Sequence, residues 1–169
     1  MKHDILFRDL NSMSVHEEFM RRAISLATEN VRSNAGGPFG AVIVKDGKIV
    51  GEGANTVTAT NDSTAHAEVT AIRDACRNLN TFDLSGCVLY TSCEPCPMCW
   101  AASYWAHIGT IYYGNRAEDA ARINFADAFL YEQLALPREK RVIPEHELLR
   151  TEAWESFQAW QESTTKMEY

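Results

Sequence analysis

The chain carries the stretch His66-Ala67-Glu68 and, further along, the stretch Pro95-Cys96-Pro97-Met98-Cys99. His66, Cys96 and Cys99 offer one nitrogen and two sulfurs, which are ligand types that a tetrahedral zinc ion accepts. Three protein ligands leave the fourth position free for water, as in a catalytic zinc site. Zinc lowers the pKa of such a water toward about 7, and Glu68 is placed to carry its proton to a leaving group. The two stretches therefore predict one zinc ion per subunit and a hydrolytic site.

Two other metal sites compete with this interpretation. Cys93, Cys96 and Cys99 have the spacing of an iron–sulfur run, but its bacterial form adds a further cysteine followed by proline. No cysteine follows Cys99 in this chain. A structural zinc site with Cys93 as fourth ligand remains open as an alternative. A closed site of that kind would hold no water and would leave Glu68 without a function.

The two stretches are expected at the starts of two helices, and this placement organises the fold. The polar run Asn61-Asp62-Ser63-Thr64 supplies N-cap candidates, so His66 and Glu68 are expected in the first turn of the helix that follows. Pro97 suits the first position of a second helix, which extends to Ala106. Cys96 and Cys99 then lie one helical turn apart.

Apolar patterns on either side predict the remaining elements. An amphipathic helix is expected over residues 15–31, and two strands over residues 39–44 and 48–53 are joined by a hairpin at Asp46-Gly47. Further strands are expected over residues 87–91 and 108–113, and further helices over residues 117–121 and 126–136. The order α-β-β-α-β-α-β-α predicts a three-layer α/β/α sandwich with a mixed central sheet.

Length and composition narrow the class of protein. A chain of 169 residues with 46% hydrophobic residues fits one domain, residues 1–169, whose core buries roughly 70% of the unfolded surface. No apolar run is long enough to span a membrane, and the closely spaced cysteines fit reduced thiols, so a cytoplasmic protein is expected. The net charge of −7 disfavours nucleic acid as a partner, because phosphate contacts need cations. A free base or nucleoside is the better fit.

The C-terminal segment, residues 151–169, has a distinct pattern. Trp154, Phe157 and Trp160 recur at helical spacing, which predicts a helix with an aromatic stripe. Such a stripe must pack against something, either its own subunit or a partner subunit. The pattern alone does not separate these alternatives.

Long stretches of the sequence resemble zinc-dependent nucleobase deaminases, which share the histidine-x-glutamate and proline-cysteine-x-x-cysteine signature. The resemblance is strongest to bacterial guanine deaminases and runs from the first predicted helix to the last tyrosine. It is carried by the stretches Gly36–Val44, Asn61–Arg73 and Tyr90–Cys99. It implies the cytidine deaminase-like fold and a homodimer that exchanges its C-terminal segments.

The resemblance also implies roles for single residues. His66, Cys96 and Cys99 would hold zinc, and Glu68 would transfer protons. Asp127 would contact the exocyclic amine at C2 and join Glu68 as a catalytic residue. The implied binding residues for the purine are Phe39, Asn55, Ala67, Trp105, Asp127 and Tyr169. The family often has two consecutive aspartates where this chain has Ala126-Asp127, so its affinity or preference is expected to differ.

The implied reaction is the hydrolytic deamination of guanine to xanthine and ammonia, a step of purine catabolism. Water activated by zinc attacks C2, and Glu68 protonates a ring nitrogen before the amine departs. Guanosine is the alternative substrate, and cytosine, aminotriazines and pterins stay open because each presents an amine on a similar heterocycle. From a different class, a catalytically silent dimeric scaffold stabilised by zinc is also open. Intact Glu68 argues against it.

Overall fold

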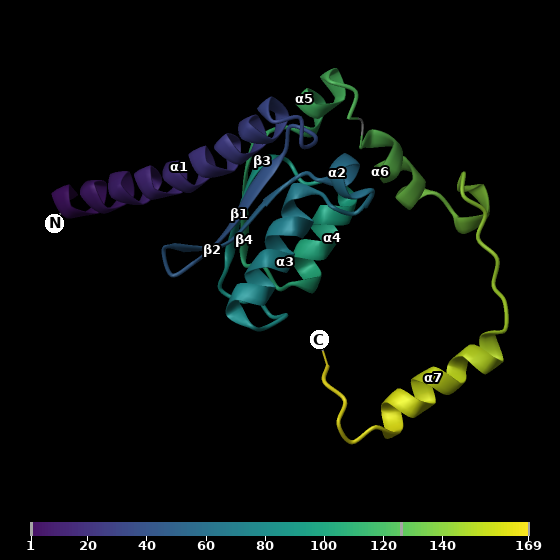
Figure 1. Ribbon diagram of the computed structural model, residues 1–169. Coiled ribbons are helices and arrows are strands. Elements are labelled where there is room, and N and C mark those ends of the chain that lie inside the picture. Colours follow the sequence, from purple (N-terminus) through teal and green to yellow (C-terminus); the bar gives the residue numbers. More distant parts are fainter. Residues whose placement is uncertain (1, 126, 169) are drawn as a thin grey trace. The chain divides into compact units, whose positions relative to one another are not determined.

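The computed structural model describes residues 2–125 and 127–168, with side chains from residue 13 onward. The chain forms two compact units, one ending at Asp127 and one beginning at Ala128. The expectation of a single domain over residues 1–169 stays a prediction. Figure 1 shows the sheet of the first unit with helices on both sides.

A four-stranded mixed sheet forms the centre of the first unit. Strand β1 (Gly40–Lys45) pairs antiparallel with β2 (Lys48–Ala54) and with β3 (Val88–Cys93), whereas β3 pairs parallel with β4 (Thr110–Asn115). The strand order is β2-β1-β3-β4. The turn between β1 and β2 has positive φ at Asp46 (49°) and Gly47 (72°), which confirms the predicted hairpin.

Helices cover both faces of this sheet. Helix α1 (Lys2–Arg32) packs on one face, and α3 (Ala67–Leu79) packs on the other, with α4 (Pro97–Trp105) beside α3. Successive residues of β1 point to opposite faces: Ala41 and Ile43 join the core under α3, whereas Val42 and Val44 join the core under α1. The three-layer α/β/α fold with a mixed sheet is thereby confirmed.

Helix α3 lies unusually close to strand β2. A Cβ atom added at Gly53 would lie 2.3 Å from the carbonyl oxygen of Ala67, so only glycine permits this approach. The helix presents Ala67, Ala71 and Ala75 to the sheet, and all three are fully buried. Small residues on both elements thus allow the start of α3 to pack closely against the sheet.

The segment before α3 differs from the sequence-based prediction. Residues Val57–Thr60 form a short helix, α2, that the apolar pattern did not predict. Asp62 does not cap α3, because its carboxylate accepts hydrogen bonds from the backbone and hydroxyl of Thr64 in a local turn. The residue at the N-cap position of α3 is His66. Glu68 lies in the first turn of α3, as predicted.

Among the residues that the structure describes, all regular elements after β4 are helical. Helix α5 (Ala117–Arg122) completes the first unit, and the second unit contains α6 (Ala128–Ala135), the 3-10 turn η1 (Arg138–Lys140) and α7 (Arg150–Glu162). The aromatic stripe of Trp154, Phe157 and Trp160 lies on α7 and is exposed. Across the described residues, no helix combines the length and the apolar character needed to cross a membrane.

Candidate active site

The three predicted zinc ligands come together at the starts of two helices. His66 is the N-cap residue of α3, Cys96 is the N-cap residue of α4, and Cys99 lies in the first turn of α4. Nδ1 of His66 lies 3.5 Å from Sγ of Cys96 and 3.5 Å from Sγ of Cys99. Their ligand atoms all lie within 4.8 Å of one another. Among the described residues they are the one such group of three or more.

These distances fit a tetrahedral zinc ion. Bond lengths near 2.1 Å to nitrogen and 2.3 Å to sulfur place a nitrogen and a sulfur ligand about 3.6 Å apart at the tetrahedral angle. The prediction that His66, Cys96 and Cys99 form the zinc site is therefore confirmed. Cys93 is not part of this group, although its buried side chain lines the adjoining pocket.

The pKa values of the two cysteine ligands shift in opposite directions. The hydrogen bond from Cys99 lowers the pKa of the Cys96 thiol to about 4, with help from His66. The same hydrogen bond, together with burial, raises the pKa of Cys99. Hydrogen bonding to Cys96 raises the pKa of His66. Cys96 is therefore the more acidic of the two thiols, and the helix N-terminus favours a thiolate at its position.

Glu68 lies in the first turn of α3, beside the ligand group. Its side chain is buried, and burial raises the pKa of its carboxyl group above the ordinary value. The hydroxyl group of Thr91 on strand β3 donates a hydrogen bond to Oε1 at 3.1 Å. A carboxyl group with a raised pKa next to a metal site is suited to accept and return a proton near neutral pH.

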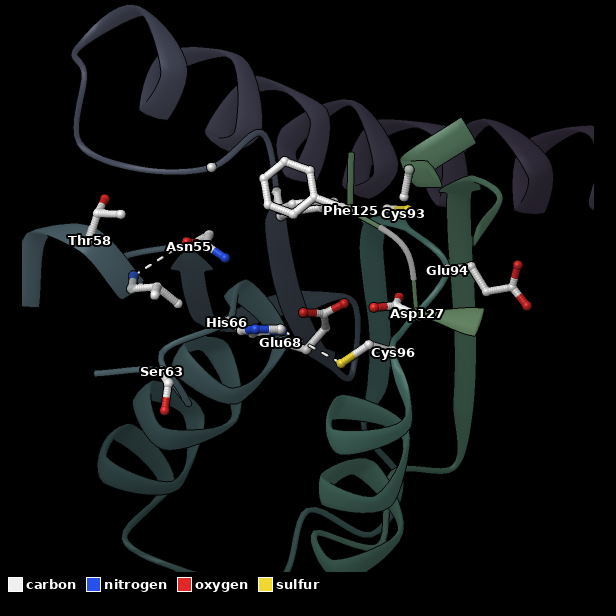
Figure 2. A pocket seen from close by; sticks show the side chains of 14 residues that line it. Asn55, Thr58, Ser63, His66, Glu68, Cys93, Glu94, Cys96, Phe125 and Asp127 are labelled. Carbon is white, nitrogen blue, oxygen red and sulfur yellow. Dashed lines mark hydrogen bonds between the residues drawn. The ribbon is translucent and has the colours of Figure 1, made fainter. Parts of the chain in front are cut away.

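A pocket of about 210 Å³ opens over the ligand group. Figure 2 shows Glu68 and Asp127 directed into the same space beside His66 and Cys96. Burial raises the pKa of Asp127, and the negative charge of Cys96 adds to this effect. The pocket is further lined by Gly37, Phe39, Asn55, Val57, Thr58, Ser63, Cys93, Glu94, Ala120 and Phe125.

The side chains of Asn55 and Phe39 form one wall of this pocket. Oδ1 of Asn55 accepts a hydrogen bond from the backbone of Val57 at 3.3 Å, and Figure 2 shows the amide nitrogen turned away from that bond. The backbone N–H of Asn55 donates to the carbonyl oxygen of Phe39 at 3.1 Å. The ring of Phe39 meets the ring of Phe125 edge to face, with centroids 5.0 Å apart. This wall offers a flat apolar surface and one amide.

The remaining predicted site residues lie elsewhere. Ala67 is buried between His66 and Glu68 at the start of α3, behind the pocket lining. Trp105 ends α4, is 67% exposed and does not line the pocket. Tyr169 and Ala126 lie outside the described residues.

Thr91 and Phe125 are among the side chains at the site that were not predicted as site residues from the sequence. Thr91 gave no signal, because a threonine within a strand is ordinary β-sheet composition. Phe125 stands two residues before Asp127. An aromatic residue so close to a candidate site residue is the signal that could have identified it.

Comparisons with known proteins agree with this geometry. Residues 13–115 match the family described as the cytidine and deoxycytidylate deaminase zinc-binding region. The chain belongs to the cytidine and deoxycytidylate deaminase family. The matched segment begins within α1, ends with β4 and includes all three zinc ligands. The zinc site and the fold of this deaminase are thus supported independently.

Individual relatives of this deaminase differ in how much of the chain they cover. The guanine deaminase of Bacillus subtilis is 53% identical over 154 residues, which is 91% of this chain and 99% of that protein. The X-ray structure of guanine deaminase from Bacillus subtilis gives a TM-score of 0.89 at 52% identity, covering 91% of this chain and 98% of that chain.

Two other relatives match less of the chain. A solved structure of guanine deaminase from Nitrosomonas europaea is 33% identical with a TM-score of 0.62, covering 64% of this chain and 63% of that chain. A tRNA-specific adenosine deaminase of Aquifex aeolicus is 47% identical over 76 residues, which is 45% of this chain and 50% of that protein. Of these three relatives, only the Bacillus subtilis guanine deaminase is matched over more than two thirds of this chain.

Proposed function

We propose that this deaminase hydrolyses guanine to xanthine and ammonia, as an aminohydrolase of purine catabolism. One observation carries the proposal: the similarity to the Bacillus subtilis guanine deaminase extends over nearly the full length of both proteins. It therefore extends beyond the zinc-binding region to Phe125 and Asp127, which also line the pocket. The ligand group and the buried carboxyl of Glu68 supply the general chemistry of the reaction.

Several residues at the pocket have a task in this reaction. When bound, zinc activates the attacking water. Glu68 takes the proton of that water, donates it to a ring nitrogen as C2 becomes tetrahedral, and so prepares the amine to leave. The rings of Phe39 and Phe125 hold the flat base, and such aromatic contacts with a base are worth about 1–3 kcal/mol each. Ala67 contributes only backbone, next to the reacting centre.

Asp127 and Asn55 orient the base within the pocket. The amide nitrogen of Asn55 donates to an acceptor of the purine ring, because its oxygen is already held by Val57. Asp127 accepts from the exocyclic amine at C2, and in its protonated state it assists the departure of ammonia. Its raised pKa supports this second task, since a neutral carboxyl can donate a proton.

The experiment that tests the proposal is a substrate panel with an ammonia assay. Zinc-loaded full-length protein is incubated with guanine, guanosine, cytosine and adenine, and an aminotriazine and a pterin extend the panel. We expect ammonia from guanine, with xanthine as the second product in equal amount. Release from guanosine alone would move the assignment to a nucleoside deaminase. Release from none of the compounds would favour the zinc-stabilised scaffold.

A polynucleotide substrate is disfavoured although one relative is a tRNA-specific adenosine deaminase. That similarity stops at about half of either chain. The net charge of −7 also opposes the phosphate contacts on which RNA binding depends. The charge and the pocket fit a small purine base as the substrate. We expect neither nucleic acid nor a membrane as a partner.

We further propose a homodimer that exchanges its C-terminal segments, residues 151–169. Support comes from the exposed stripe of Trp154, Phe157 and Trp160, which leaves a large aromatic surface without cover in one chain. In such a dimer Tyr169 would close the site. Trp105 lies eight residues beyond Pro97, about 12 Å along α4, so its contact with a base would require a second chain. A cytoplasmic location fits the five free cysteines.

A further inference from the structure

Asn30 near the end of helix α1 connects two loops through a single amide group. Its side-chain nitrogen donates a hydrogen bond to the carbonyl oxygen of Gly37 at 2.8 Å and another to the carbonyl oxygen of Asn55 at 2.8 Å. The residue is only 7% exposed. A side-chain amide has two hydrogens on its nitrogen, so both donors of Asn30 are committed to these two carbonyls.

Both acceptors belong to the wall of the pocket. Gly37 and Asn55 each line it, and Asn55 is also bound through its backbone N–H to Phe39. The backbone of Gly36 is pressed against the same residue, since a Cβ atom added at Gly36 would lie 2.0 Å from the carbonyl oxygen of Asn55. The two segments therefore form one packed unit, and Asn30 anchors it to α1.

We propose that Asn30 is a positioning residue for purine binding. By holding the backbone of Asn55 against Gly37, it sets the direction in which the Asn55 carboxamide and the Phe39 ring face the base. Asn30 does not line the pocket itself and touches no reacting atom. The inference rests on the proposed function only in its choice of ligand, because the anchoring contacts are independent of the substrate.

The substitution Asn30→Asp tests this role with little change in shape. An aspartate keeps the size of the side chain but presents two oxygens to two carbonyl oxygens, so both hydrogen bonds are replaced by repulsion. Small displacements of a group that orients a substrate weaken binding strongly, and a shift of about 1 Å can cost up to about 100-fold in activity. We expect KM for guanine to rise about 10-fold or more, whereas kcat changes less than about threefold.

A second substitution crowds the same carbonyl without removing the amide of Asn30. The Cβ atom introduced by Gly36→Ala would lie 2.0 Å from the carbonyl oxygen of Asn55 and 3.0 Å from Nδ2 of Asn30, so it must displace Asn55 or its own loop and disturb their contact while the Asn30 amide itself is kept. We expect the same rise in KM. Thr28→Ala is the matched control, because its exposed hydroxyl only bonds back to Ile24 within α1. That variant should keep the KM of the unaltered protein.

Each variant is first measured for zinc content and thermal stability, since a merely structural role would lower stability and leave KM unchanged. Calorimetric binding of xanthine then gives the affinity without turnover, and Asn30→Asp should weaken it by the same factor as KM. An unchanged KM and an unchanged xanthine affinity in folded Asn30→Asp protein would overturn the proposal. Failure of the unaltered protein to bind any purine would instead contradict the proposed function.

A spectroscopic measurement tests the anchoring without any ligand and without relying on the proposed function. The side-chain NH₂ signal of Asn55 in a ¹H–¹⁵N NMR spectrum is assigned by its loss in Asn55→Ala. We expect this signal to shift in Asn30→Asp and Gly36→Ala and to stay in place in Thr28→Ala. A signal that does not move in either of the first two variants would refute the positioning role. Asn30→Ser, which keeps one donor, serves if Asn30→Asp does not fold.

Discussion

Thr91 on strand β3 donates a hydrogen bond to Glu68 on helix α3 at 3.1 Å, and both side chains are buried. The strand thus helps to fix the orientation of the carboxyl group through its Oε1 atom. Burial raises the pKa of Glu68, whereas this hydrogen bond lowers it. Hydrogen bonds from its own backbone and from Cys99 lower the pKa further, so the Thr91 bond is one of several effects on the proton affinity of the group that we propose as the proton carrier.

Thr91→Val should reduce kcat while zinc content stays at one per chain. Valine has the shape of threonine without the donor, so Glu68 loses one hydrogen bond and its orientation. A hydrogen bond to a charged group is worth about 1.5–3 kcal/mol, which corresponds to roughly a 10-fold to 100-fold lower kcat. Steady-state kinetics with guanine measure this. Thr28→Val on the surface of α1 is the control, and an unaltered kcat in Thr91→Val would disprove the orienting role.

Zinc binding should depend on three residues and not on the neighbouring cysteine. His66→Ala, Cys96→Ser and Cys99→Ser are each expected to lose most of the metal, because each removes one of only three protein ligands. Cys93→Ser should retain one zinc per chain, since Cys93 lies outside the ligand group. Metal content is measured by atomic emission on purified protein. Metal loss in Cys93→Ser would contradict the open site.

Glu68→Gln should retain zinc and lose about 10²–10⁴-fold in kcat, the range typical of general acid–base catalysis. Glutamine preserves the size of the side chain and the bond to Thr91 but cannot carry a proton. Kinetics and metal analysis on the same preparation separate the two effects. Full turnover in this variant would eliminate Glu68 as the proton carrier.

Tyr90→Phe should change the pH dependence of stability on the alkaline side. The Tyr90 hydroxyl and Nδ1 of His16 share a hydrogen bond, and the ring stacks on Tyr112 with centroids 5.1 Å apart. Burial raises the pKa of Tyr90 above its ordinary value of 10. The unfolded chain therefore ionises first as the pH rises above 10, and the free energy of unfolding decreases until the folded pKa is passed.

The substitution removes this titration, so the two proteins should converge at high pH. Near pH 8 we expect Tyr90→Phe to be less stable by about 1 kcal/mol, the usual value of one hydrogen bond. The difference should shrink in thermal melts above about pH 10, where only the tyrosine protein is penalised. A difference that stays constant from pH 8 upward would argue against a raised pKa.

Truncation before Thr151 should abolish the proposed dimer. The shortened chain lacks Trp154, Phe157 and Trp160, the exposed aromatic surface that we assign to the interface. Light scattering should report the mass of one chain for the truncated protein and of two for the full-length protein. Activity should fall as well, because Tyr169 is removed. A dimer of unchanged stability after truncation would rule out exchange of these segments.

The sheet and its helices were predictable because local signals and tertiary packing agree there. The hairpin at Asp46-Gly47, the alternating strand β1 and the proline at the start of α4 each carry a signal that needs no distant partner. Helix α2 escaped prediction because its four residues bury no apolar face. The N-cap of α3 was not predicted, because the Asp62 carboxylate accepts a hydrogen bond from the Thr64 hydroxyl instead of capping the helix. His66 therefore occupies the N-cap position.

The candidate site was predictable only in part. Metal ligands are recognisable by residue type and spacing, so His66, Cys96 and Cys99 could be named in advance. Thr91 and Asn30 act through contacts with residues that are distant in sequence, and each is an ordinary residue for its own strand or helix. Trp105 was named from family resemblance alone, and its exposed position in one chain leaves that contact to the proposed dimer.

Helices α3 and α4 both begin at a zinc ligand, and neither His66 nor Cys96 caps its helix with a side-chain hydrogen bond. A good N-cap side chain is worth about 1 kcal/mol, so the two helices forgo this stabilisation in favour of metal binding. Bound zinc would therefore stabilise the starts of α3 and α4 in addition to its role in the reaction. Scarcity of the metal would loosen the first turns of both helices together. Bound zinc would then contribute to the stability of both helix starts as well as to activity.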